Sequence, residues 1–127
     1  MDDFTTAYIE TALWSSTGDN DRPLDDDFSP DDLAPEALAK IEKDCAAFQE
    51  TPAWLAAIEA DAFNPCRATG CSTESRGGHD FWLTRNRHGA GYWDGEWSEP
   101  HGKALTDIAH SFGEVDLYAG DDGRLYL

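Results

Sequence analysis

The hydrophobic period of this chain changes near residue 78, and this change constrains the fold more than any other feature of the sequence. Before it, apolar residues recur at helical spacing; after it, apolar and polar residues begin to alternate, which is typical of half-buried strands. The change predicts an α+β fold in which N-terminal helices pack with a C-terminal ββαββ antiparallel sheet unit. The 127 residues are expected to form one domain, made of an acidic helical part (1–63), a loop (64–78) and the ββαββ part (79–127).

Local start signals divide the N-terminal part into helices. Residues 4–16 predict a first helix, and Ser29 followed by Pro30 combines an N-cap residue with a first-turn proline. Pro35 is expected to restart the helix after one turn, and Thr51 precedes another proline in the same way. The apolar residues expected to face inward are Phe4, Tyr8, Ala12, Leu38, Ile41, Cys45, Phe48, Leu55, Ile58 and Ala62.

The C-terminal part carries two hairpin signals around one helix. Residues 80–86 and 90–95 flank a His-Gly pair and predict a hairpin, while 114–118 and 124–127 flank an Asp-Gly turn, the strongest short hairpin signal. Residues 103–112 match the helical template between them. In the first hairpin, a two-residue turn would place the tryptophans at 82 and 93 on one face.

The charge is large and unevenly distributed. The net charge is −17, and residues 1–63 contribute sixteen acidic and three basic residues, against ten and six in residues 64–127. Such a field opposes direct binding to nucleic acid or to an anionic membrane, because both require a basic surface. It favours a basic protein as the partner. The residues predicted to bind that partner are Asp19, Asp21, Asp25, Asp26, Asp27, Asp31, Asp32, Glu36, Trp82 and Trp93.

Metal binding by these residues is not predicted. In a calcium loop starting at Asp19, Pro23 would occupy a ligand position and Leu24 the position that requires glycine. Cys66 and Cys71, with His79 and then His88 or His101, resemble a zinc site only loosely, since structural zinc usually needs a second closely spaced pair. Two reduced thiols or a disulfide are the alternatives, and no cofactor is expected.

An enzymatic function is not favoured either. His79, Asp80, His88, Asp94, Ser98 and His101 include residue types used in acid–base and nucleophilic catalysis, but no nucleophile, phosphate-binding or dinucleotide motif accompanies them.

The aromatic residues of the second half have two interpretations. Trp82, Tyr92, Trp93 and Trp97 are interleaved with Arg85 and Arg87. They form either the sheet core or an exposed binding hot spot.

Four stretches resemble a family of small acidic proteins encoded by bacteriophages and prophages. They are TALWSST (11–17), LAPEALAKIEKDCAAF (33–48), GHDFWLTRNRHGAGYWDG (78–95) and FGEVDLYAGDDGRLYL (112–127). The resemblance lends no catalytic residues, and residues 64–75 depart from the family pattern, so it does not extend to the cysteine pair. It implies a role against host defences, since small acidic phage proteins often block restriction enzymes or CRISPR effectors, sometimes by imitating DNA.

Together these features predict a non-enzymatic phage protein that binds a basic host protein. A DNA-mimic-like inhibitor of a nucleic-acid-binding defence system, of restriction or CRISPR type, is the favoured form. The alternatives are a structural or housekeeping phage domain, and a small metal-binding or hydrolytic protein using Cys66, Cys71, His79 and His88. The chain has no long apolar run and no signal-like N-terminus, so it is expected in the host cytoplasm, where an aromatic hairpin could also form a homodimer.

Overall fold

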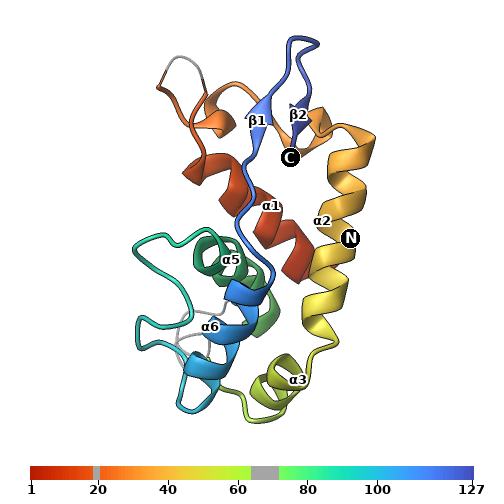
Figure 1. The fold of residues 1–127 in the computed structure, drawn as a ribbon. Helices are drawn as coiled ribbons and strands as arrows, with labels where there is room; N and C mark the ends of the chain where they lie inside the picture. The colour runs from red at the N-terminus through yellow and green to blue at the C-terminus, as the bar shows by residue number, and fades with distance from the viewer. Residues whose placement is uncertain (19–20, 64–71) are drawn as a thin grey trace.

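The computed structural model describes residues 1–18, 21–63 and 72–127, and in this part the chain is mostly helical (Figure 1). The α-helices are α1 (Asp3–Ser15), α2 (Pro35–Gln49), α3 (Pro52–Glu59), α5 (Thr73–Arg85) and α6 (His101–Ser111). Two short 3-10 helices, η1 (Leu24–Asp26) and η2 (Pro30–Asp32), connect α1 to α2. The described strands are β1 (Tyr118–Ala119) and β2 (Leu125–Tyr126), which pair antiparallel.

The predicted ββαββ unit is therefore wrong. Residues 80–86, expected as a strand, lie almost entirely in α5, and residues 90–95 form turns instead of a second strand. The predicted loop over 64–78 is also wrong at its end, since α5 begins at Thr73. The reason is that α5 is buried nearly all round from Gly77 to Arg85, so it lacks the polar face that gives a surface helix its period.

The second predicted hairpin is confirmed in a shorter form. Tyr118 pairs with Tyr126 and Ala119 with Leu125, and Gly123 in the turn has a φ of +78°. Figure 1 shows the chain drawn out between α6 and β1, but residues 114–117 form no ladder, so the sheet of the described chain is limited to these two strands.

The predicted helix signals are confirmed. Pro30 lies in η2 and Pro35 opens α2, while the Thr51 side chain accepts a hydrogen bond from the backbone N–H of Trp54. The predicted helix over 103–112 is α6, and Gly113 follows it with a φ of +79°.

The inward face predicted for the third helix is partly wrong. Leu55 is 56% exposed, Ile58 is half-buried, and Ala62 is buried beyond the end of the helix. Trp54 and Ala57 face the core instead.

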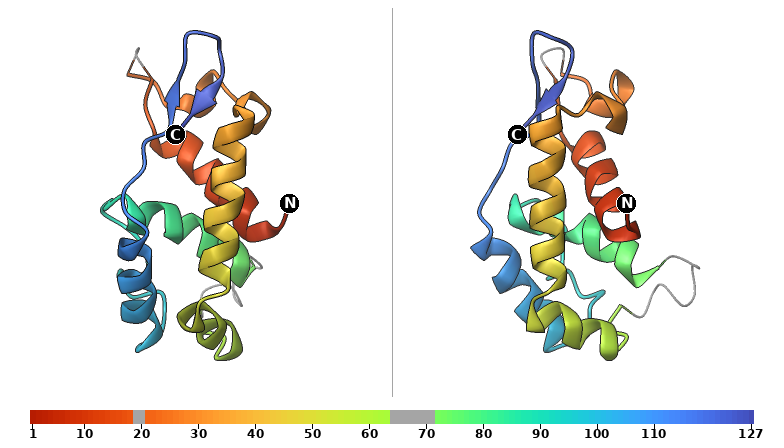
Figure 2. Two further views of the ribbon diagram at one scale, coloured as in Figure 1. Left: turned by 45° about the vertical axis from the view of Figure 1, so that its right-hand side comes forward. Right: turned by 90° about the vertical axis from the view of Figure 1, so that its right-hand side faces the viewer.

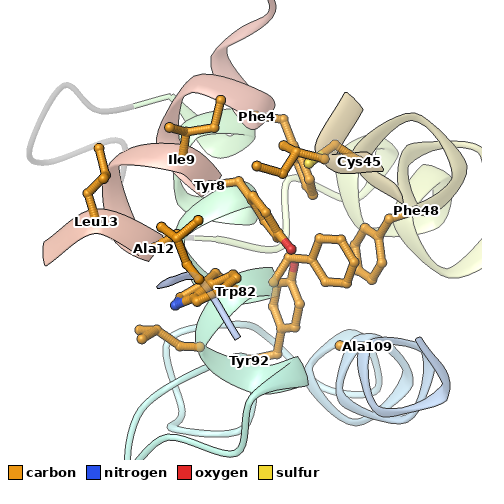
Figure 3. Close-up of a cluster of buried hydrophobic side chains, with 14 of the residues drawn as sticks. Phe4, Tyr8, Ile9, Ala12, Leu13, Cys45, Phe48, Trp82, Tyr92 and Ala109 are labelled. Atoms are coloured by element: carbon orange, nitrogen blue, oxygen red, sulfur yellow. The ribbon is translucent and has the colours of Figure 1, made fainter. Parts of the chain in front are cut away.

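The core lies where α5 passes between α1 and α6, with α2 packed directly against α1 (Figure 2). Its centre is aromatic: the Phe48 ring of α2 stacks on Phe81 of α5 at 4.3 Å between centroids and also lies parallel to the Tyr92 ring. Phe4 and Tyr8 of α1 also contact Phe81, and Figure 3 shows Tyr8 pointing from α1 into this buried cluster. Among the described residues, no helix combines the length and hydropathy that a membrane crossing requires.

Candidate functional site

One end of the molecule carries the acidic residues predicted to bind a partner. In the described part, Asp21, Asp25, Asp26, Asp27, Asp31 and Glu36 are exposed and Asp32 is half-buried. The predicted Asp19 lies outside the described residues. Arg22 pairs with Asp26 at 3.5 Å and with Asp27 at 3.6 Å, and each of the three side chains is about half exposed.

Buried leucines and backbone hydrogen bonds hold this segment so that its carboxylates face the solvent. Leu24 is buried, and its backbone N–H donates to the carbonyl of Ser16, which fastens η1 to the end of α1. In η2, the backbone N–H of Ser29 donates to the Asp32 carboxylate at 2.8 Å. Leu33, which follows η2, is also buried. Leu24 and Leu33 thus fix the segment to the core, and the acidic residues between them are left at the surface.

The terminal hairpin adds a second acidic segment to the same end. Leu33 bridges Leu125, and the backbone N–H of Ala34 donates to the Leu125 carbonyl at 2.9 Å. Figure 1 shows the hairpin lying between η1 and the start of α2. Residues 21–36 and 118–124, which we call the acidic end, hold nine acidic and two basic residues, so they contribute −7 of the net −17.

A hydrogen bond within the hairpin orders one of these carboxylates. The Tyr126 hydroxyl donates to Asp122, and this bond lowers the pKa of Asp122 and raises that of Tyr126. The negative charge of Glu36, in the first turn of α2, also raises the pKa of Tyr126.

A polar groove of about 680 Å³ lies beside the acidic end. Its lining comes from the end of α1, the end of α5 and the extended segment that leads from α6 to β1. The lining residues are Ser15, Ser16, Thr17, Trp82, Asn86, His88, Glu114, Val115, Asp116, Leu117 and Tyr118. The sequence analysis missed this groove, and it predicted residues 114–118 as a strand, of which only Tyr118 lies in β1.

The two tryptophans predicted to bind a partner are separated by the structure. Trp93 is 52% exposed, whereas Trp82 is 2% exposed and its indole N–H donates to the Ser15 hydroxyl at 2.8 Å. Figure 3 shows Trp82 within the buried cluster beside Ala12. The prediction that Trp82 and Trp93 share a strand face is therefore wrong, and Trp82 supports the core and the floor of the groove.

Most of the motif over 78–95 serves the fold. Asp80 is buried, accepting a hydrogen bond from the Trp97 indole at 2.6 Å and lying 2.7 Å from Nδ1 of His79. The Thr84 hydroxyl accepts from the backbone N–H of Tyr92 at 3.0 Å. These bonds hold the turns after α5 against the helix.

Arg85 is the most connected residue of this motif. The guanidinium is 1% exposed and donates to the carbonyls of Phe112 and Gly113, to the Tyr8 hydroxyl and to the Asp44 carboxylate, at 2.9 to 3.1 Å. It thereby satisfies carbonyl groups at the end of α6, which that helix leaves without an internal partner.

The alternative of a metal-binding or hydrolytic protein relied on Cys66, Cys71, His79 and His88. In the described part of the chain, no group of three or more His, Cys, Asp or Glu side chains is placed to hold a metal ion. His79 has an acidic neighbour in Asp80, but no serine or cysteine of residues 1–18, 21–63 and 72–127 hydrogen-bonds its ring. Cys66 and Cys71 lie outside the described residues.

Comparisons with family models, curated proteins and solved structures found no match to this chain. The resemblance to small acidic phage proteins therefore stays a prediction from the motifs.

Proposed function

We propose that this chain is a non-enzymatic binding protein that engages a basic protein through its acidic end. The observation that carries this proposal is the joining of two acidic segments, 21–36 and 118–124, through the contact of Leu33 and Ala34 with Leu125. A protein that used acidic residues only for solubility would have no need to gather them at one end. Clustered charge instead steers a partner of opposite sign and accelerates its association.

The partner class follows from the same electrostatics. Proteins that bind nucleic acid present basic surfaces to phosphates, and an acidic end can occupy such a surface in place of DNA. The resemblance to small acidic phage proteins supports a host defence protein, of restriction or CRISPR type, as this partner. The proposed role is thus a DNA-mimic-like inhibitor acting in the host cell.

Charge reversal tests the proposal. The variant Asp25→Lys, Asp26→Lys, Asp27→Lys is compared with Glu42→Lys, Glu50→Lys, Glu59→Lys, which makes the same change in net charge at exposed positions of α2, its C-cap and α3. Basic proteins captured from bacterial lysate at low salt are identified by mass spectrometry, and the association rate of each is measured against salt and with duplex DNA as competitor.

The acidic-end variant is expected to associate about tenfold more slowly than wild type, with a flatter salt dependence, while the control variant changes much less. Duplex DNA is expected to compete for the captured partner. An equal loss in both variants would assign the effect to net charge alone, and an unchanged rate in the acidic-end variant would contradict the proposal.

A further inference from the structure

The polar groove beside the acidic end has a wall that is fixed in place. Both ends of the Asn86 amide are used: its nitrogen donates to the Trp82 carbonyl at 3.1 Å, and its oxygen accepts from the backbone N–H of Val115 at 2.8 Å. Leu117 is buried two residues later and anchors the same segment. The extended segment 114–118 is thus held against the end of α5, and the groove is a built feature of the fold.

The exposed groups of this wall are acidic and aromatic. Val115 and Leu117 turn inward, so the alternate residues Glu114, Asp116 and Tyr118 are exposed. The opposite wall is the C-terminal end of α1, which carries the negative end of the helix dipole and has no basic residue in its last turn. His88 is the one lining residue that can carry a positive charge.

These groups select an organic cation. An anion would be repelled by two carboxylates, by the end of α1 and by the net charge of −17. A divalent metal ion would need more ligands than the two carboxylates, and no metal-holding group is found among the described residues. A guanidinium fits better, because it forms forked hydrogen bonds to carboxylates and stacks on aromatic rings such as that of Tyr118.

The wall also fits an extended peptide. In an extended segment the N–H and C=O of one residue point to the same edge, and these two groups of Asp116 make no hydrogen bond within the described part of the chain. An extended partner segment can pair with such groups by strand addition, and its alternate side chains then point to the same side. Glu114 and Asp116 have this two-residue spacing.

We infer that the groove binds an extended, arginine-bearing segment of the basic partner, with a guanidinium held between Glu114, Asp116 and the ring of Tyr118. This inference rests on the proposed function and extends it, since it gives the long-range attraction of the acidic end a specific point of contact. The volume of about 680 Å³ is within the range of pockets that enclose a ligand of several side-chain groups.

The test uses the full-length protein and a short synthetic peptide with blocked ends, in which arginine alternates with serine. Binding is measured by calorimetry and mapped by NMR chemical shifts on labelled protein. The variant Glu114→Gln, Asp116→Asn is compared with Glu42→Gln, Glu59→Gln, which removes the same charge from exposed positions outside the groove. Thermal unfolding of each variant confirms that it is folded.

Shift changes are expected at residues 15–17, 86, 88 and 114–118. The groove variant is expected to bind the peptide roughly tenfold more weakly, as the loss of charge-assisted hydrogen bonds implies, while the control loses no more than about twofold. A peptide with lysine in place of arginine is expected to bind several-fold more weakly, because lysine lacks the planar fork.

Equal weakening in the two variants, shift changes confined to other surfaces, or no binding at all would each overturn the inference. Equal affinity for the lysine peptide would overturn the assignment to arginine. These failures leave the proposed function standing, because that is measured with the 25–27 reversal, which does not alter the groove. Conversely, a partner unaffected by that reversal contradicts the proposed function whatever the peptide does.

Discussion

Arg85 shows how one charged side chain can join distant parts of a small core. Its guanidinium contacts α1 through Tyr8, α2 through Asp44, and the end of α6 through two carbonyls. It also lies over the rings of Phe81 and Phe112, at 5.3 Å and 5.8 Å from their centroids. A buried charge of this kind is tolerated only because its donors are hydrogen-bonded, and its removal leaves the acceptors without partners.

Replacing Arg85 is therefore expected to destabilise the protein strongly. Arg85→Ala should lower the free energy of unfolding by about 3 to 5 kcal/mol, as is typical of a broken buried ion pair. Arg85→Lys should also lose stability, because an ammonium group cannot reach the same four acceptors. Urea unfolding followed by circular dichroism measures both.

The matched control is Arg87→Ala, since Arg87 is exposed two residues later. Its effect should stay within about 0.5 kcal/mol, as for most surface substitutions. If Arg85→Ala costs no more than this control, the structural role of Arg85 is wrong.

At the scale of elements, the close approach of α1 and α5 depends on glycine. A Cβ built on Gly78 would lie 1.9 Å from the backbone carbonyl oxygen of Phe4, and one on Gly77 would lie 2.2 Å from the Trp54 ring. The absence of a side chain at Gly78 lets α1 and α5 pack backbone to backbone, and its absence at Gly77 leaves room for the Trp54 ring of α3. The same Gly-Gly pair misled the sequence analysis, because glycine lowers helix propensity and is common in loops.

Gly78→Ala is expected to destabilise the protein by about 3 kcal/mol or more, because backbone atoms cannot move aside as a flexible side chain would. In an ordinary helix interior the same change stabilises by about 0.5 to 1 kcal/mol. The sign of the change in unfolding free energy therefore shows whether α1 and α5 pack this closely. Thermal and urea unfolding both report it.

Gly89→Ala provides the comparison, since a Cβ there meets no atom within 4 Å. It should change stability by no more than about 0.5 kcal/mol. A stabilised Gly78→Ala variant would show that α1 and α5 do not pack as described.

At the scale of the whole molecule, the carboxylates of the acidic end repel one another. Nine acidic residues share this end with Arg22 and Arg124, while α3 lies at the far end of the molecule (Figure 2). Like charges gathered in this way destabilise the compact state, and salt screens the repulsion.

Added NaCl is therefore expected to stabilise the folded protein. Between about 0.01 and 0.15 M, where the Debye length falls from about 30 to about 8 Å, the free energy of unfolding should rise by about 1 to 2 kcal/mol. Asp25→Lys should reduce this dependence more than Glu59→Lys, which makes the same charge change on α3. Equal salt dependence in the two variants would show that the repulsion is spread evenly over the surface.

The sequence by itself determined the features that depend on neighbouring residues. Ser29, Pro35 and Thr51 marked helix starts through capping and proline geometry, and the Asp-Gly turn marked the terminal hairpin. These signals act within a few residues, so they do not depend on the rest of the fold. The exposure of the carboxylates of 21–36 was also predicted from neighbouring residues, because these offer a run of aspartates no partners with which to be buried.

Only the tertiary structure decided the identity of α5 and the full extent of the site. Because α5 is buried on nearly all sides, its apolar residues do not recur at helical spacing. Apolar and polar residues alternate in it instead, as they do in a strand. The convergence of 118–124 on 21–36 depends on contacts of Leu33 and Ala34 with Leu125, about ninety residues apart in the chain. Such pairings are set by the packing of the whole molecule, which no local pattern of residues encodes.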